Sequence, residues 1–99
     1  MARFDLYRMA GVDGYVLDIQ ASFLNQLDTR LVVPLLLAKN APRPAIRLNP
    51  CFHIDGNDVV MMTQFMASVP RGALTAIIGN LSDHHDVIVS AVDFLMQGF

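Results

Sequence analysis

Two adjacent histidines near the C-terminal end are the first residues of this chain that could carry chemistry. His84 and His85 stand between Asp83 and Asp86, and imidazole and carboxylate groups together can ligate a metal ion or transfer protons. A helical pattern covers these positions, and adjacent side chains on a helix point about 100° apart. The two imidazoles therefore do not converge easily on one ion, and we interpret all four as polar residues of a first helical turn.

A second possible reactive group is His53 with Asp55, close to Cys51. His53 alternates with the apolar residues of a short strand, which favours a histidine at the edge of a barrel with a local hydrogen bond. Cys51 is the only cysteine, so it forms no internal disulfide, and its neighbour Phe52 favours a buried structural thiol over a nucleophile. We predict no catalytic residue, no metal site and no cofactor.

The composition limits the class of partner. Seven lysines and arginines against nine aspartates and glutamates give a net charge of −2, the wrong sign for a protein that binds phosphates, so direct nucleic-acid binding is disfavoured. A hydrophobic content of 54% and a mean hydropathy of +0.42 are high for a monomer of 99 residues. We expect one domain, residues 1–99, that covers part of its apolar surface in a homodimer.

The chain shows no targeting or membrane signal. Residues 1–14 carry scattered charges and no continuous apolar stretch, unlike a signal peptide. The longest apolar run, Leu31 to Ala38, is broken by Pro34 and is far shorter than the roughly 20 residues of a membrane helix. We therefore expect a cytoplasmic protein that does not contact a membrane.

The elements that must position these residues begin with a hairpin. Arg3 to Met9 and Tyr15 to Gln20 alternate between apolar and polar residues, as amphipathic strands do, and glycines lie between them. Ala21 to Thr29 has no clean period and ends in polar groups. It predicts a connecting loop that projects three apolar side chains outward: Phe23, Leu24 and Leu27.

The middle of the chain predicts further strands. Leu31 to Leu37 reads as a central strand buried on both faces, with Pro34 at a bulge or bend, and Lys39 to Pro44 reads as an exposed loop. Short strands follow at Ile46–Leu48, Cys51–Ile54 and Val59–Thr63, the last two joined through Asp55-Gly56-Asn57. Strands at this spacing are typical of a small antiparallel barrel or twisted sheet.

The last segment predicts a helix. Ser82 can cap its N-terminus, and Gly98 can end it after Gln97. One stripe is apolar: Val87, Ile88, Ala91, Val92, Leu95 and Met96. The opposite stripe is polar: Asp86, Ser90, Asp93 and Gln97. Val89 and Phe94 widen the apolar face beyond what packing on one small sheet would use, so part of it is expected to meet a second subunit.

Several short motifs resemble, in order and spacing, those of the CcdB family of bacterial toxins. They are Asp18-Ile19-Gln20, Arg30 followed by Val32 to Leu35, His53-Ile54, Met61-Met62-Thr63, Met66 to Pro70, and Leu81-Ser82. The two methionine-containing motifs are the most specific, because no general rule of strand composition asks for that order. The resemblance spans the chain and implies a mainly β fold, an SH3-like barrel. Such a fold has a five-stranded antiparallel sheet, a smaller sheet and a C-terminal helix.

The resemblance also implies a function. Members of the family are homodimeric toxins that bind the A subunit of DNA gyrase and trap the enzyme with both DNA strands cut. They catalyse no reaction, and a CcdA-like antitoxin neutralises them. The implied gyrase-binding residues are Phe23, Leu24, Asn25, Asp93, Gln97, Gly98 and Phe99.

This chain departs from the family pattern at three of those positions. Gln97 stands where the family has a tryptophan that stacks on an arginine of gyrase, and glutamine offers no aromatic face. Asp93 replaces an asparagine, and Phe99 replaces an isoleucine. Two interpretations of Phe99 stay open: it docks onto a partner, or it packs on its own subunit.

Two alternatives to a gyrase poison follow from the same residues. An endoribonuclease of the MazF type shares the barrel, but it needs a basic RNA groove and a general base. The available basic residues are few and scattered: Arg30, Lys39, Arg43, Arg47 and Arg71. The other alternative is a homologue that still binds antitoxin but lacks toxicity towards gyrase, which the loss of the tryptophan would fit.

Overall fold

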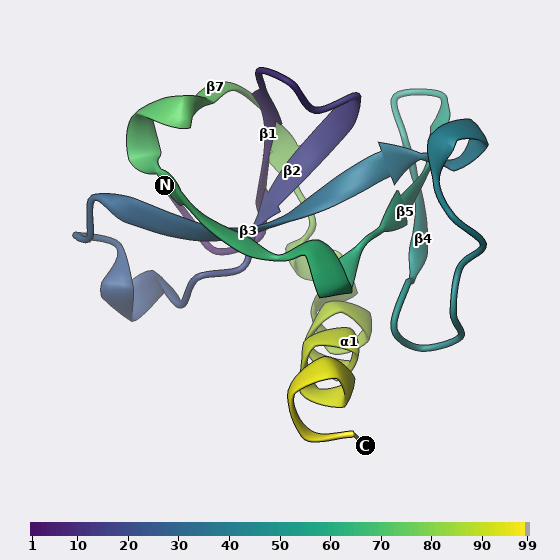
Figure 1. The fold of residues 1–99 in the computed structure, drawn as a ribbon. Coiled ribbons are helices and arrows are strands. Elements are labelled where there is room, and N and C mark those ends of the chain that lie inside the picture. The colour runs from purple at the N-terminus through teal and green to yellow at the C-terminus, as the bar shows by residue number, and fades with distance from the viewer. Residues whose placement is uncertain (99) are drawn as a thin grey trace.

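A computed structural model of the chain describes residues 1–98. An antiparallel sheet curls into a half-barrel, and the helix α1 (His85–Gln97) extends away from one side of it (Figure 1). The strands are β1 (Asp5–Met9), β2 (Gly14–Asp18), β3 (Thr29–Leu37), β4 (Cys51–Ile54), β5 (Asn57–Met61), β6 (Ala67–Pro70) and β7 (Leu74–Asn80). The predicted mainly β fold with a C-terminal helix is confirmed.

The long strand β3 organises the sheet. The strand order is β4-β5-β3-β2-β1-β7, and β6 also pairs with β3. One edge of β3 pairs with β2 in unbroken register through Pro34, whereas the other edge pairs first with β6 and then with β5. Pro34 lies at this exchange, where its carbonyl accepts a hydrogen bond from the Met62 N–H at 2.9 Å. A residue without an N–H fits where the ladder changes partner, so Pro34 marks that change and not a bulge against β2.

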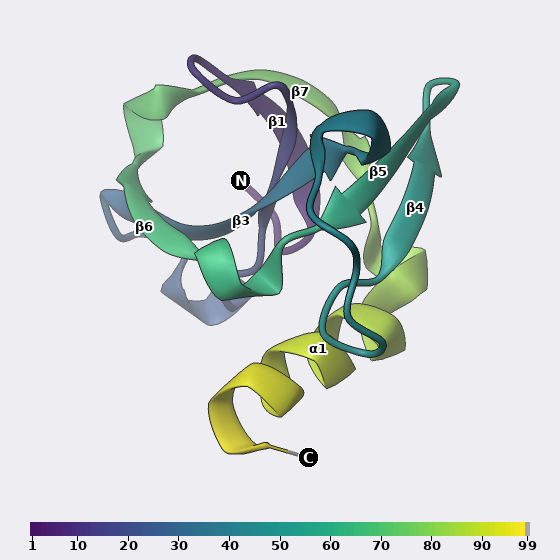
Figure 2. The same cartoon turned by 45° about the vertical axis from the view of Figure 1, so that its right-hand side comes forward.

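The curled sheet buries side chains on both of its faces. One apolar cluster lies between the sheet, the β4–β5 hairpin and α1, and it contains Leu6, Leu17, Leu35 and Ile88. The other cluster lies inside the ring formed by β1, β3, β6 and β7 (Figure 2), and it contains Tyr7, Val16, Val32 and Leu74. Both faces of β1 and β2 are covered. The alternation of residues along these strands therefore sends successive side chains into two different cores, and not alternately into core and solvent.

The polar residues of the N-terminal strands are buried together with partners. Tyr7 donates a hydrogen bond to Asp5 Oδ2 at 3.2 Å. Burial, and then the neighbouring Asp5 carboxylate, raise the pKa of the Tyr7 phenol to about 12. The phenol therefore remains a neutral donor at physiological pH.

Two turns depend on residues that tolerate positive φ. At Gly14, with φ +131°, a Cβ atom would collide with the carbonyl oxygen of Leu35, so only glycine lets β2 approach β3 this closely. The β4–β5 hairpin turns at the predicted place, through Asp55 and Gly56, both with positive φ. Positive φ was expected at Gly56 and Asn57, but Asn57 already pairs with Ile54 as the first residue of β5.

The predicted strand Ile46–Leu48 is wrong. This segment is a turn closed by Asn49, whose Oδ1 accepts from the Ala45 N–H at 3.0 Å and whose own N–H donates to the Ala45 carbonyl at 2.9 Å. Arg47 adopts a positive φ of 71°, and Ile46 is almost fully exposed. A side chain that closes a turn on the backbone competes with strand pairing.

The predicted burial of Cys51 is also wrong. On β4 the even-numbered residues Phe52 and Ile54 point into the core, which leaves Cys51 and His53 exposed. His53 has the predicted local hydrogen bond, with Asp58 opposite it in the β4–β5 ladder at 2.8 Å.

The helix begins later than predicted. Ser82 to His84 form a 3-10 turn, and the Ser82 side chain makes no capping hydrogen bond, so α1 starts at His85. Its C-terminus agrees with the prediction, because Gly98 takes a left-handed conformation and its N–H donates to the Phe94 carbonyl at 2.8 Å.

The apolar stripe of α1 is only partly buried. Ile88 and Ala91 are buried, with Val89 and Val92 packed beside them. Three members of the predicted stripe are exposed: Val87, Leu95 and Met96. The C-terminal part of α1 projects beyond the sheet (Figure 1), so the sheet cannot cover it. No helix within residues 1–98 is long and apolar enough to cross a membrane.

Candidate partner-binding site

The loop between β2 and β3 displays apolar side chains to solvent. Its first half forms the 3-10 turn η1 (Ser22–Leu24), and Phe23 is 94% exposed at the tip. Leu24 and Leu27 are 44% and 48% exposed. These are the three side chains that the sequence predicted to project outward. Apolar groups gathered on one exposed loop are typical of a protein interaction site.

A buried ion pair lies at the base of this loop. Asp18 and Arg30 are both fully buried, with Arg30 Nη2 at 2.7 Å and Nε at 2.8 Å from Asp18 Oδ2. Arg30 Nη1 also donates to Asn25 Oδ1 at 3.3 Å, which links the pair to the loop. Burial raises the pKa of the Asp18 carboxyl, while hydrogen bonds from the Gln20 N–H and from Arg30 oppose that rise.

Gln20 ties the N-terminal half of the loop together. Its Nε2 donates to the Leu24 carbonyl at 2.9 Å, and its Oε1 accepts from the Leu31 N–H at 2.9 Å. The motif Asp18-Ile19-Gln20 therefore has a structural role, because two of its side chains shape the loop that carries Phe23.

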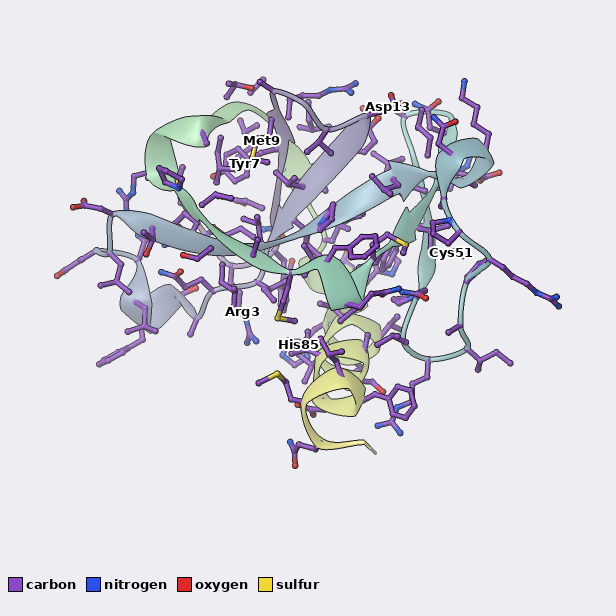
Figure 3. The ribbon with its side chains drawn as sticks, in the orientation of Figure 1. Arg3, Tyr7, Met9, Asp13, Cys51 and His85 are labelled. Atoms are coloured by element: carbon purple, nitrogen blue, oxygen red, sulfur yellow. The ribbon has the colours of Figure 1, made fainter. Side chains whose placement is uncertain are left out.

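A small cavity separates the base of the loop from α1. It measures about 130 Å³ and is lined by Arg3, Phe4, Ile19, Leu31, Ile88, Val89, Val92 and Asp93. Arg3 lies between the loop and the helix (Figure 3), donates from Nε to the Ile19 carbonyl at 3.3 Å, and places its guanidinium 4.7 Å from the centre of the Phe4 ring. The structure thus brings Asp93 to the side of α1 that faces the base of the loop.

The end of the helix lies on the same side of the molecule as the loop. Both are in the lower half of the two ribbon views, with the helix end projecting furthest (Figures 1 and 2). Gln97 is exposed as the last residue of α1, and Gly98 ends it. Phe99 lies outside the described residues. The predicted binding residues that are described therefore fall into two groups, one on the loop and one along α1.

The histidines of the helix start pack on buried aromatic rings. His84 contacts Phe52 edge to face, with ring centres 5.1 Å apart, and His85 contacts Phe4 in the same way at 5.5 Å (Figure 3 labels His85). We predicted ordinary polar residues here, but both imidazoles also pack the start of α1 against the barrel. Residues 1–98 contain no group of three or more histidine, cysteine or acidic residues placed to hold a metal ion.

Sequence reasoning missed three residues that shape this side of the molecule. Arg3 and Leu31 line the cavity, and Arg71 reaches the loop from the turn that follows β6. No local pattern marks them, because each contact depends on how distant strands pair.

Comparison with known proteins gives two findings. A family model described as CcdB protein matches residues 3–98, nearly the whole chain. A solved structure described as an endoribonuclease in complex with its cognate antitoxin, from mycobacterial species, is similar with a TM-score of 0.78. It is 14% identical, and the match covers 97% of this chain and 94% of that one. At this identity the second likeness concerns the fold alone.

Proposed function

The chain belongs to the CcdB family, and on that premise we propose that it is a gyrase-poisoning toxin of a toxin–antitoxin module. In this proposal it binds the A subunit of DNA gyrase, traps the complex with cleaved DNA, and catalyses no reaction itself. The observation that carries the proposal is the family match over residues 3–98. An exposed apolar loop beside a projecting helix end supports it, because such a surface suits a protein partner.

We propose that seven residues contact gyrase, in two groups. The loop contributes Phe23, Leu24 and Asn25. The helix and chain end contribute Asp93, Gln97, Gly98 and Phe99. Phe23 suits the role of an anchor, since a large exposed side chain on a supported loop can enter a partner's pocket with little rearrangement.

We further propose that a CcdA-like antitoxin neutralises the toxin in the cytoplasm. Family membership supports a toxin–antitoxin role, and the antitoxin tail would be acidic or amphipathic and disordered until it binds. It would cover part of the surface that faces gyrase. Gyrase and the antitoxin could then not bind that surface at the same time.

An endoribonuclease is the second candidate, because the structural neighbour carries that description. The disposition of the basic residues argues against it. Arg30 is buried against Asp18, Arg47 donates to Ser90 Oγ at 3.0 Å, and Arg71 binds backbone carbonyls of the loop. Three of the five basic residues considered for an RNA groove are thus engaged with this chain's own groups.

Expression in bacteria distinguishes the candidate functions. We expect growth arrest and accumulated DNA cleavage in cells with sensitive gyrase, normal growth in matched cells whose gyrase A subunit is resistant, and relief by the cognate antitoxin. Arrest in both strains with fragmented RNA would favour the endoribonuclease. Normal growth in both strains, with antitoxin still bound, would identify a homologue without toxicity.

We also expect a stable homodimer at micromolar concentration. The exposed apolar side chains of α1, Val87, Leu95 and Met96, suit burial against a second copy. Sedimentation equilibrium should give about twice the chain mass of 10.9 kDa. A single species at the monomer mass at that concentration would contradict the dimer.

A further inference from the structure

Arg71 reaches the exposed loop from a distant part of the sequence. It follows β6 directly and opens the 3-10 turn η4 (Arg71–Ala73). Its Nη2 donates to the Leu27 carbonyl at 3.1 Å and also to the Asn25 carbonyl. These contacts join residues 44 and 46 positions apart.

The pairing of β3 with β6 determines this position. Thr29 lies opposite Pro70 in that ladder. Asp28, which precedes Thr29, and Arg71, which follows Pro70, therefore meet where the loop enters the sheet. There the Arg71 N–H donates to the Asp28 carbonyl at 2.8 Å. The backbone and side chain of Arg71 thus donate to three carbonyls in the C-terminal half of the loop, those of Asn25, Leu27 and Asp28.

The two halves of the loop have different supports. Gln20 holds the N-terminal half through Leu24 and Leu31, as described above. In the C-terminal half, the Arg71 guanidinium provides charge-assisted donors to two carbonyls, which are stronger than neutral ones. Arg71 Nε is buried without a partner among residues 1–98, so Nη2 carries the side-chain contacts to the loop.

We infer that Arg71 is a positioning residue that fixes the loop from Phe23 to Leu27 in the conformation that meets the partner. This inference rests on the proposed function. A loop ordered before binding loses less conformational freedom when the complex forms, so a fixed loop binds more tightly than a mobile one. Arg71 is itself only partly exposed, contacts the loop backbone, and acts through the exposed side chains of the loop.

The test compares Arg71→Ala and Arg71→Lys with two controls. Arg43→Ala removes an exposed arginine elsewhere and matches the change in charge. Thr75→Val removes a neighbouring side-chain hydrogen bond, from Thr75 Oγ1 to the Arg8 carbonyl at 3.0 Å, which joins β7 to β1 and does not touch the loop. Each variant is examined by amide hydrogen exchange, by binding to the gyrase A dimerisation region, and by thermal unfolding.

We expect Arg71→Ala to speed exchange of the amides from residues 24 to 28 about tenfold and to weaken gyrase binding by a similar factor, while exchange in β2 and β5 is unchanged. Arg71→Lys, which keeps a charged donor, should recover part of both effects, and the controls should show neither. Unchanged loop exchange, or faster exchange with unchanged binding, would overturn the inference. If the unaltered protein does not bind gyrase, the proposed function fails, and the loop exchange alone decides whether Arg71 fixes the loop.

Discussion

Replacing Arg30 with leucine is expected to lower the free energy of unfolding by about 3–5 kcal/mol, because the substitution leaves the Asp18 carboxylate buried without its partner. Small domains are stable by only about 5–15 kcal/mol, so this loss is a large part of the total. Urea unfolding at neutral pH measures it. The exposed Arg43→Leu is the matched control, and it should change stability by less than about 0.5 kcal/mol.

The pH dependence of the Arg30→Leu variant identifies the cause. Burial already raises the pKa of Asp18, and removing the guanidinium that opposes the rise must raise it further. A carboxyl whose folded-state pKa is raised contributes stability below its unfolded-state pKa, and that contribution is lost as the pH rises through the folded-state value. The deficit relative to the unaltered protein should therefore be small in acid and grow towards neutral pH.

Replacing both Asp18 and Arg30 tests whether the unpaired charge causes the loss of stability. Asp18→Leu combined with Arg30→Leu leaves no unpaired charge, so the double variant should recover much of the stability lost by Arg30→Leu alone. A deficit in Arg30→Leu below about 1 kcal/mol, or one that does not depend on pH, would show that Asp18 finds water or another donor.

Local pattern predicted the elements whose signals are short-range. Alternation predicted the first hairpin, the Asp55-Gly56-Asn57 segment predicted the β4–β5 turn, and Gly98 predicted the helix end. In each case the residues that decide the conformation lie within a few positions of one another. These conformations can therefore be predicted without knowledge of the fold.

Long-range pairing decided what local pattern could not. Asp18 and Gln20 occupy the polar side of an alternating strand, yet both are buried because Arg30 and the loop backbone supply their partners. Strands β6 and β7 were not predicted from the pattern, since β7 has little buried surface and shifts register against β1. Ile77 in β7 is 61% exposed, so no apolar alternation marks the strand.

In the candidate site too, some features could be predicted from local pattern and others could not. The exposed apolar loop could be predicted because Phe23, Leu24 and Leu27 lack the period of either a strand or a helix. The role of Arg71 could not, because it depends on the register between β3 and β6. The sequence predicted that part of the apolar face of α1 would be left uncovered by the sheet, but not which part, since that depends on how far the sheet extends beneath the helix.

Replacing Gln97 with tryptophan is expected to tighten gyrase binding by about one to two powers of ten. Gln97 is exposed at the last position of α1, so a larger side chain there meets no core residue. An indole stacked on a partner's guanidinium contributes roughly 1–2 kcal/mol when water is excluded, which corresponds to that range. Binding to the gyrase A dimerisation region measures the change, and Gln97→Leu controls for added apolar area without a strong cation-binding face.

Deleting Gly98 and Phe99 should have the opposite effect, abolishing gyrase binding while the barrel stays folded. The Gly98 N–H donates to the Phe94 carbonyl in the last turn of α1, and that turn projects beyond the sheet. Its loss should fray the end of the helix and leave the core around Ile88 and Ala91 intact. If Gln97→Trp leaves binding unchanged, the protein meets gyrase through another surface. If the deletion unfolds the protein, Phe99 packs on its own subunit and belongs to the core and not to the site.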